Sequence, residues 1–434
     1  MQKNDQNYKR ITFLIKITYE TAPGEELFVY GDNNDFGNWS AKFKLNWSKG
    51  NIWTADYTFP ISTEFIKYKF VVRTNNSVKW EEGDNRLLST KYLNGLKRTD
   101  DGKYILDCIW GAFKIDFNIH YILNDSSFMR IIGGAPALND WKTPVRMELD
   151  NHKKITTKDG NIIQGFWTIS LLMKSDEKKN FNFEYRYSIY DEKLDSAIWE
   201  REPVRQIHIL TELNDGNSDN FKNNPDEYKL LVNSHLEVLD VNFVEDLVFN
   251  RMGNKNIYIG PYPQNLEEYK ILKENGITDT LNVQSEKDIV RKQVNLKLHI
   301  KQTKKLGIEI HRYPILDFNA EELQIKLKGA ADLLKDLLEK GKIVYVHCTS
   351  GMSRGAATVI LYLVLYENYT VKEAINFCKK YRPVICPNYD VINKVAEKYK
   401  PGSEMKESYE DNIDIKLEFK KLRENNKLKK NLIQ

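Results

Sequence analysis

The sequence predicts a multidomain protein in which two all-β immunoglobulin-like sandwiches precede one α/β domain. The chain has 434 residues, and at ~150 residues per domain this length predicts about three domains. The first half alternates apolar and polar residues with a period of two, which is typical of half-buried strands. The second half alternates helix-like and strand-like segments, which indicates an α/β domain.

The first sandwich is predicted over residues 1–108. Residues 11–19 place their apolar side chains on one face of a strand, and residues 65–72 repeat that pattern. The Gly, Asp and Asn residues at 31–34 are typical of a turn. Short strands separated by such turns favour a sandwich of about 100 residues.

An internal repeat defines the second sandwich, which is predicted over residues 109–210. Five features recur in the same order in the two copies. In the first copy they are Gly37-Asn38-Trp39-Ser40, Trp53, residues 65–70, Trp80-Glu81 and Arg86. In the second copy they are Asn139-Asp140-Trp141-Lys142, Trp167, residues 183–187, Trp199-Glu200 and Arg205. The second copy is longer, largely because of a polar stretch at 151–161 that we interpret as a loop insertion.

The predicted α/β domain covers residues 239–400. A polar segment rich in Asn, Asp and Gly precedes it at 211–238 and predicts a linker. Within the domain, an amphipathic helix is expected at 321–340, followed at 342–346 by an apolar run typical of a central buried strand. The charged tail at 401–434 is helix-permissive and suggests no role.

Composition excludes several classes of function. The 65 basic and 61 acidic residues are interspersed, which argues against a nucleic-acid surface. The first residues lack the apolar core of a signal peptide, and the longest apolar stretch, about 356–366, is shorter than the ~20 residues of a membrane helix. Four cysteines in no paired or metal-ligand spacing are typical of a reduced protein. We therefore expect a cytoplasmic protein without nucleic-acid or membrane partners, and the sequence leaves its oligomeric state open.

One loop between the predicted buried strand and a helix carries reactive groups. Its residues are His347, Cys348, Thr349, Ser350, Gly351, Met352, Ser353 and Arg354. Backbone N–H groups of such a loop and of the helix N-terminus form an anion site, and the Arg354 guanidinium can bind two phosphoryl oxygens. In that positive field Cys348 is expected to act as a thiolate nucleophile. The alternative is a structural cysteine followed by an unrelated arginine.

A displaced alkoxide needs a proton, so a general acid should lie on another loop. Asp317, 31 residues before Cys348, precedes the predicted long helix and is the candidate. The alternative for Asp317 is an ordinary loop aspartate. Because the loop and Arg354 supply the positive charge that metals supply in other phosphoryl transfers, we expect no metal and no cofactor.

Residues from about 240 to 400 resemble the dual-specificity phosphatases, and most closely the laforin-like glucan phosphatases. The resemblance rests on Tyr258–Gln264, Leu281–Ile289 and Val344–Thr349. It implies that Cys348 is the nucleophile, that Arg354 holds phosphate and that Asp317 is the acid.

The sequence departs from the family pattern within this loop. Gly355 stands where most members have Ser or Thr, which predicts slow turnover. Ser350 and Ser353 stand where the glucan phosphatases have Ala and Gly. Beside Asp317, Phe318 is a candidate active-site aromatic that could support a sugar or flank a phosphotyrosine ring.

The first repeat resembles the starch-binding domains of carbohydrate-binding module family 20. The resemblance implies a glucan site formed by Trp39, Lys69, Trp80 and Asn85. Apolar indole faces can stack on the C–H faces of glucose, while the lysine and the asparagine supply hydrogen bonds. The alternative for each tryptophan is core packing, which we expect for Trp53.

The corresponding residues of the second repeat are Trp141, Arg186 and Trp199. Val204 stands where the first copy has Asn85, so one hydrogen-bonding amide is missing. Two interpretations remain, a weaker second glucan site that adds avidity or a structural spacer. The weaker second glucan site is the favoured interpretation.

Together these features predict a glucan phosphatase that hydrolyses phosphate monoesters through a cysteinyl-phosphate intermediate. Its expected partner is phosphorylated glycogen or an amylopectin-like glucan, and its expected location is on glucan particles. One alternative is a glycogen-targeted dual-specificity protein phosphatase. Another, suggested by Gly355, is a weakly active glucan-binding scaffold.

Overall fold

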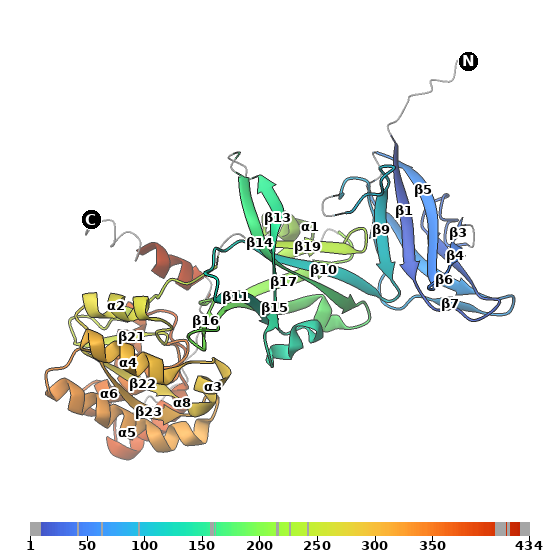
Figure 1. Ribbon diagram of the computed structural model, residues 1–434. Helices are drawn as coiled ribbons and strands as arrows, with labels where there is room; N and C mark the ends of the chain where they lie inside the picture. The colour runs from blue at the N-terminus through green and yellow to red at the C-terminus, as the bar shows by residue number, and fades with distance from the viewer. Residues whose placement is uncertain are drawn as a thin grey trace. The chain divides into compact units, whose positions relative to one another are not determined.

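The computed structural model describes residues 10–40, 43–61, 64–93, 96–156, 160, 162–213, 217–224, 227–240, 243–403, 414 and 417–425. The chain divides into two compact units (Figure 1). The first unit comprises residues 1–123, 129–187 and 204–243. The second comprises residues 124–128, 188–203 and 244–434.

The first unit begins with a sandwich of two sheets. One sheet contains β1 (Arg10–Thr18), with β5 (Ile52–Pro60) antiparallel and β9 (Tyr104–Ile109) parallel to it, and β4 (Asn46–Ser48) beside β5. The other has the order β3 (Phe43–Lys44), β2 (Glu26–Gly31), β6 (Ile66–Arg73), β7 (Val78–Trp80), and β8 (Arg86–Leu88) also pairs with β6. Phe13, Ile15 and Ile17 of β1 are fully buried in one core with Tyr68 and Phe70 of β6. The predicted period-two burial of both strands is therefore confirmed.

The same strand pairings recur in the second repeat. β10 (Ala112–Ile119) takes the place of β1, with β14 (Ile162–Lys174) antiparallel and β19 (His235–Asp240) parallel to it, and β13 (Glu148–Thr156) beside β14. The facing sheet has the order β12 (Val145–Arg146), β11 (Ser127–Gly133), β15 (Asn182–Asp191), β17 (Arg205–Leu210), β18 (Tyr228–Leu230), with β16 (Ser196–Trp199) paired to β15. Short helices are η1 (Pro136–Trp141), η2 (Lys178–Asn180) and α1 (Ser218–Asn223). Phe117 and Tyr185 bring the two sheets together, with ring centroids 5.0 Å apart.

Two sequence predictions in this unit are wrong. The segment 211–238, predicted as a linker, contains β18 and most of β19, so the second repeat ends near residue 240. Leu236 and Val238 are buried, and this short alternation is easily missed among the surrounding Asn and Asp residues. The predicted loop insertion at 151–161 forms part of β13 up to Thr156, whereas residues 157–159 and 161 lie outside the described residues.

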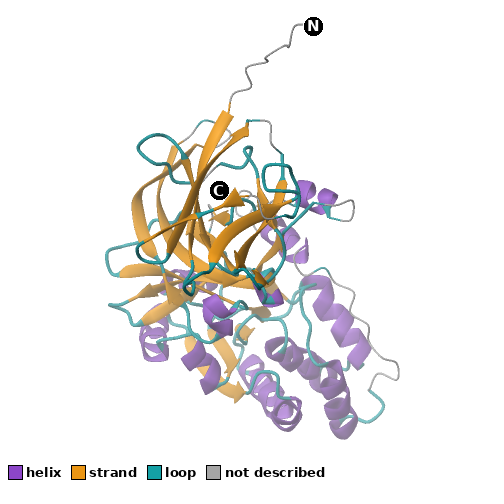
Figure 2. Cartoon of the chain, turned by 90° about the vertical axis from the view of Figure 1, so that its right-hand side faces the viewer, coloured by secondary structure: helices purple, strands orange, loops and turns teal. Residues whose placement is uncertain are grey.

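The second unit is the predicted α/β domain (Figure 2). Its sheet has the order β20 (Asn250–Arg251), β21 (Ile257–Gly260), β24 (Val344–His347), β22 (Asp279–Gln284), β23 (Glu309–Ile315), with only β20 antiparallel. The helices are α2 (Leu266–Glu274), α3 (Glu286–Arg291), α4 (Leu296–Leu306), α5 (Ala320–Glu339), α6 (Arg354–Tyr366), α7 (Val371–Tyr381) and α8 (Tyr389–Tyr399). Val344 and Val346 of β24 pack with α5 to α8. The side chain of Tyr345 points to the opposite face and packs with residues of α2 and β23. Helices therefore cover both faces, and β24 is the predicted central buried strand.

Two further segments belong to the second unit. Residues 188–203, predicted within the second sandwich, lie with the α/β domain. In the tail, residues 417–425 are helical, and Phe419 and Leu422 are buried against Val248 and Val384. Among the described residues, no helix combines the length and the apolar character needed to cross a bilayer.

Strand β19 offers a test of the corrected boundary. Val238→Ala removes buried methyl groups and should lower the free energy of unfolding of the first unit by about 2 kcal/mol. Leu239→Ala, at a neighbouring position that is 36% exposed, should have a clearly smaller effect in chemical denaturation. Equal small effects at both positions would fit a linker and contradict the strand.

Candidate active site

The catalytic loop joins the carboxyl end of β24 to the start of α6, and its conformation depends on Gly351. Gly351 has φ +69°, and a Cβ there would lie 2.1 Å from the backbone of Gly260. Only glycine therefore fits at 351 without moving the β21 end. Cys348 follows β24 directly and is buried, as are His347 and Arg354.

Carbonyl oxygens of four successive loop residues are held by donors outside the loop. The bonds run from the Tyr262 N–H to Thr349 (3.2 Å), from the Arg382 guanidinium to Ser350 (3.5 Å) and Gly351 (3.0 Å), and from the Cys386 N–H to Met352 (2.9 Å). The C=O and N–H groups of a trans peptide point in opposite directions. The N–H groups of residues 350–353 therefore face the inside of the loop. Together with the start of α6, they form the anion nest that the sequence predicts.

Arg382 was not identified from the sequence, yet it supports the loop from behind. Its side chain is fully buried and also donates to the Val248 carbonyl and to Asn250 Oδ1, each at 3.0 Å. Burial lowers the pKa of Arg382 to about 10, so the guanidinium still carries its charge at neutral pH. The only sequence signal is an arginine in the otherwise apolar stretch after α7.

The Arg354 guanidinium contacts acceptor oxygens of three other segments. Its Nη1 donates to Asp288 Oδ2 of α3 at 2.6 Å and to the Ile315 carbonyl at 2.8 Å. Its Nη2 lies 3.1 Å from Asp317 Oδ2. The Nε–H is buried and has no hydrogen-bond partner among the residues that the structure describes. An unpaired buried donor is costly, and an oxyanion inside the loop would satisfy it.

Two carboxylates beside Arg354 have opposite pKa shifts. Burial raises the pKa of Asp288, but its bonds with Arg354 and Ser285 outweigh burial and leave the pKa below its usual value. Burial also raises the pKa of Asp317, and neither the charge of Arg354 nor the other favourable interactions reverse this shift. Asp288 is therefore a fixed counter-ion, whereas Asp317 holds its proton to higher pH. The structure thus brings Asp317 to the catalytic loop, with chemistry suited to an acid.

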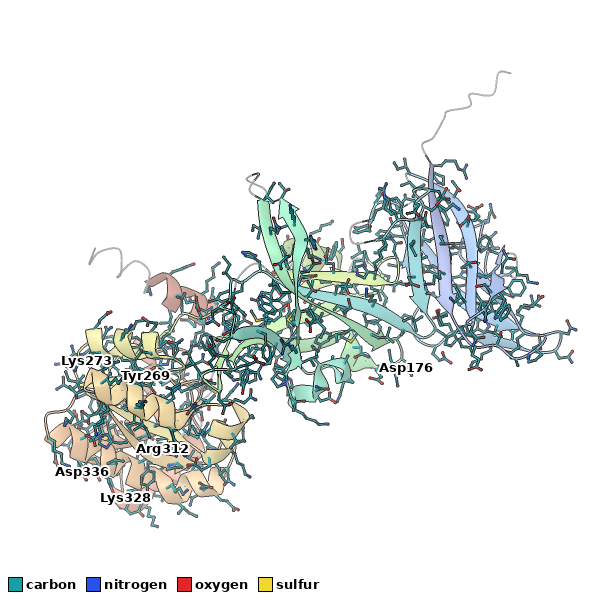
Figure 3. The ribbon with its side chains drawn as sticks, in the orientation of Figure 1. Asp176, Tyr269, Lys273, Arg312, Lys328 and Asp336 are labelled. Atoms are coloured by element: carbon teal, nitrogen blue, oxygen red, sulfur yellow. The ribbon has the colours of Figure 1, made fainter. Side chains whose placement is uncertain are left out.

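The remaining predicted loop residues have supporting positions. Burial lowers the pKa of His347 to about 3, so its ring is neutral and its Nδ1–H donates to the Cys348 carbonyl at 3.1 Å. Thr349 Oγ1 accepts from Gln284 Nε2 at 3.2 Å. Ser353 is the N-cap residue of α6 without a side-chain cap bond. The carbonyl of Gln284 in turn accepts from Arg312, which Figure 3 labels, at 3.1 Å.

Phe318 and Gly355 are explained by their surroundings. Phe318 is 98% exposed and has φ +54°, so the turn after Asp317 presents its ring to solvent. A Cβ at Gly355 would lie 3.3 Å from the Cys348 backbone nitrogen, so a side chain with a hydroxyl would crowd the nucleophile's own peptide. The departure from the family pattern removes none of the groups that surround Arg354.

The first sandwich presents two indoles to solvent. Trp39 and Trp80 are 37% and 43% exposed, and their ring centroids lie 6.5 Å apart. The Trp39 backbone has φ +62°, and its N–H donates to the Gly31 carbonyl at 2.7 Å. Lys69 points away from the core, but its Nζ donates to the carbonyls of Glu81 (3.2 Å) and Gly83 (2.6 Å).

Lys69 therefore braces the loop that carries Trp80, while Asn85 on the same loop is exposed. Trp53 is buried, as expected, and its Nε1 donates to the Tyr19 carbonyl at 3.2 Å. Trp167 makes the equivalent bond to the Tyr121 carbonyl at 3.1 Å in the second copy. The two copies thus share their structural tryptophan.

The second copy keeps only one of the two exposed indoles. Trp141 is 40% exposed and has φ +63°, which matches Trp39. Trp199, predicted to bind glucan, is only 5% exposed: Lys292 Nζ lies 4.2 Å from the centre of its ring, and its Nε1 donates to the Lys292 carbonyl at 2.8 Å. Its stacking role is therefore wrong, because the second unit covers the ring. Arg186 is half-buried on β15.

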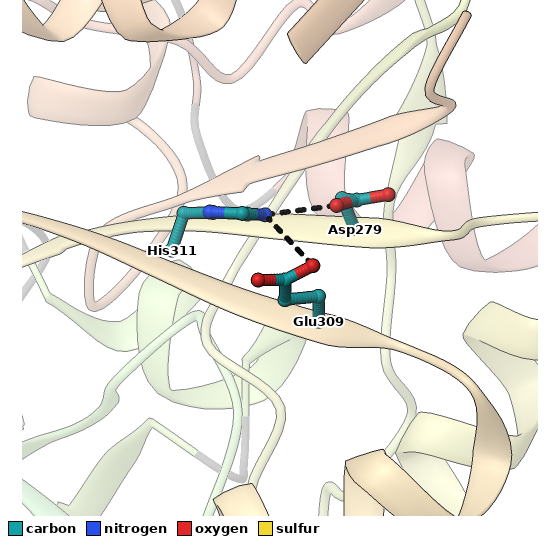
Figure 4. Close-up of side chains that lie close together, drawn as sticks. All are labelled: Asp279, Glu309 and His311. Atoms are coloured by element: carbon teal, nitrogen blue, oxygen red, sulfur yellow. Dashed lines mark hydrogen bonds and ion pairs between the residues drawn. The ribbon is translucent and has the colours of Figure 1, made fainter. Parts of the chain in front are cut away.

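One group of side chains in the α/β domain has donors suited to a metal. Asp279, Glu309 and His311 have ligand atoms within 4.8 Å of one another (Figure 4). Asp279 and Glu309 begin the parallel strands β22 and β23, so the group lies at the opposite sheet edge from Cys348. Lys342 Nζ lies 3.4 Å from Asp279 Oδ2. A lysine thus already supplies positive charge to the buried carboxylate.

Comparisons with known proteins agree with this geometry. Residues 257–401 match the dual specificity phosphatase catalytic domain, and residues 9–99 match the starch binding domain. Mouse laforin is 27% identical over 174 residues, which are 36% of this chain and 53% of laforin. The phosphoglucan phosphatase LSF1, chloroplastic, of Arabidopsis thaliana is 31% identical over 150 residues, covering 33% of this chain and 25% of its own length.

Two further similarities concern the second unit. A putative tyrosine phosphatase of Invertebrate iridescent virus 6 is 37% identical over 81 residues, which are 19% of this chain and 57% of the viral protein. The solved structure of PTPMT1 has 22% identity and a TM-score of 0.30, covering 35% of this chain and 95% of PTPMT1. The chain spans 57% or less of these three curated relatives.

The fold of residues 257–401 and the loop around Cys348 define a cysteine-based phosphatase domain of the dual-specificity type. An N-terminal starch-binding domain accompanies it. The chain thus combines a starch-binding domain and a dual specificity phosphatase catalytic domain.

The raised pKa of Asp317 predicts the pH dependence of catalysis. A general acid must be protonated, so the rate should fall as pH rises through that pKa. Asp317→Asn should remove this basic limb and lower kcat on an alkyl phosphate by about 10²-fold or more. Steady-state rates between pH 4 and 8 would measure both effects. A basic limb that persists in the variant would assign the acid to another group.

Proposed function

We propose that this protein is a glucan phosphatase that binds glycogen- or starch-like polymer and hydrolyses phosphate monoesters on it. The observation that carries the proposal is the unpaired, buried Nε–H of Arg354 inside a loop whose N–H groups face inward. An oxyanion in the loop would accept hydrogen bonds from these donors. The starch-binding domain and a plant relative named as a phosphoglucan phosphatase favour a phosphorylated glucan as the substrate.

The residues of the loop define the chemical steps. Phosphoryl oxygens bind the loop N–H groups and Arg354 Nε, and the Cys348 thiolate attacks phosphorus. The S–P bond forms as the ester P–O bond breaks, and the leaving oxygen takes the proton of Asp317. The Asp317 carboxylate then accepts a proton from water as that water attacks phosphorus and releases Cys348 and inorganic phosphate.

The tryptophans would hold the polymer. Trp39 and Trp80 present apolar faces for glucose rings, while Asn85 is exposed for hydroxyl groups. We infer that the second repeat is a further immunoglobulin-like sandwich of starch-binding type. Of its predicted site residues, Trp141 best supports sugar stacking. The second repeat would therefore act as a weaker glucan site. Four reduced cysteines support a cytoplasmic location on glucan particles.

A glycogen-targeted protein phosphatase is the second candidate. The exposed ring of Phe318 beside Asp317 could flank a phosphotyrosine ring as readily as it could support a sugar. The viral relative named as a putative tyrosine phosphatase is consistent with this candidate. A weakly active scaffold is less favoured, because the Gly355 departure leaves the groups around Arg354 in place.

A comparison of rates on different substrates separates these functions. Purified protein should release phosphate from phosphorylated amylopectin, and Cys348→Ser should abolish the release. Trp39→Ala should lower the rate on dilute polymer by about 10-fold while leaving the rate on p-nitrophenyl phosphate unchanged. Trp47→Ala, which alters another exposed indole of the same sandwich, is the matched control.

Three outcomes would contradict the proposal. Faster turnover of phosphopeptide than of polymer would favour the protein phosphatase. Equal release by Cys348→Ser and the native protein would refute the cysteine mechanism. If the protein turned over no phosphate ester, the weakly active glucan-binding scaffold would be the remaining interpretation.

A further inference from the structure

We propose that residues 196–203, which lie outside both matched domains, are a positioning element for the catalytic loop. They form β16 and the turn that follows it, and they belong to the second compact unit. The proposal rests on the phosphatase function above but concerns residues outside the two matched ranges. Arg201 and Trp199 are the residues through which this segment acts.

Arg201 is buried within the second unit. Its Nη2 pairs with both carboxylate oxygens of Glu268 in α2, and both side chains are less than 8% exposed. Its Nη1 donates to the Tyr262 carbonyl at 2.9 Å. Its backbone N–H donates to the Val244 carbonyl at 2.6 Å. Removing one partner of such a pair leaves a buried charge uncompensated, so the pair fixes the segment to the phosphatase.

The backbone of Trp199 is held by one side chain of the phosphatase. Gln264 Oε1 accepts from the Trp199 N–H at 2.6 Å, and Gln264 Nε2 donates to the Trp199 carbonyl at 2.7 Å. The Gln264 N–H in turn donates to Glu268 Oε2 at 2.6 Å. Two residues of the loop 261–264, Tyr262 and Gln264, are therefore held by residues of the segment or by their partner Glu268.

This loop is the outer support of the catalytic loop. The Tyr262 N–H donates to the Thr349 carbonyl, and this bond turns the next N–H, that of Ser350, toward the phosphate position. The Pro261 carbonyl accepts from Tyr345 in β24 at 2.6 Å. Arg201 holds the carbonyl of Tyr262, which lies in the next peptide group along the chain, so a shift of Arg201 would move the residue whose N–H donates to Thr349.

A second route runs from the segment to Arg354. The Ala197 N–H donates to the Gln293 carbonyl at 3.1 Å, and the Trp199 indole donates to the Lys292 carbonyl. Lys292 is the C-cap residue of α3, and α3 carries the Asp288 that holds Arg354. The segment therefore supports both the loop carbonyl at Thr349 and the counter-ion of Arg354.

The test uses the full chain with substitutions that do not touch the substrate. Gln264→Ala removes both bonds to Trp199 without leaving a buried charge, and Arg201→Met breaks the ion pair. Lys270→Ala is the matched control, because Lys270 lies in α2 but forms an exposed pair with Glu267. The readouts are the thermal midpoint, kcat and KM on p-nitrophenyl phosphate, and the rate of Cys348 alkylation by iodoacetate at pH 6. Both rates are measured well below each thermal midpoint.

We expect Gln264→Ala and Arg201→Met to lower kcat by about 10-fold or more and to slow the alkylation of Cys348, with Lys270→Ala unchanged. A lower thermal midpoint with native kcat and native alkylation would show that the segment only stabilises the fold, and would overturn the proposal. Alkylation needs no turnover. A native protein inactive on every ester would therefore refute the proposed function while this experiment still tested the positioning role.

Discussion

The buried contact between Arg354 and Asp288 is the interaction on which the site depends. Burying either charge alone would cost several kcal/mol, and the 2.6 Å contact between them compensates that cost. Because Asp288 lies on α3 and Arg354 begins α6, the pair also fixes α3 to the start of α6, where the catalytic loop ends. With both Nη groups bound to protein, Nε is the donor that remains for a ligand. Packing and ligand binding thus use different nitrogens of the same side chain.

The two β-repeats show how one topology can serve two purposes. β1 and β10 pair with equivalent strands in equivalent directions, and Trp39 and Trp141 have nearly the same backbone conformation. The copies differ in what covers the last tryptophan of the repeat. Trp80 is open to solvent, whereas Trp199 is covered within the second unit. The two copies are similar scaffolds, and local packing determines which indoles are exposed to solvent.

Local patterns explain which features the sequence could predict. Cys348 and Arg354 lie in one short loop between an apolar strand and a helix, so their proximity follows from the chain itself. Asp317 could be proposed because a loop before a long helix returns to the same sheet edge. The burial of Trp199 and the support from Arg382 could not be predicted, because both depend on partners distant in sequence. The strand β19 was missed for another reason: its alternation is short and lies in a polar stretch.

Charge compensation around the catalytic loop favours a bound anion. Arg354 has the ionised Asp288 as its counter-ion, whereas the oxygens that Arg382 contacts at 3.0 Å are neutral carbonyls and an amide. When Asp317 holds its proton, as its raised pKa favours, the two arginines face one ionised carboxylate. One positive charge then remains beside the inward N–H groups, and a phosphate ester can balance it. The buried charge of Arg382, which is costly to folding, therefore contributes to the field that favours an anionic substrate in the loop.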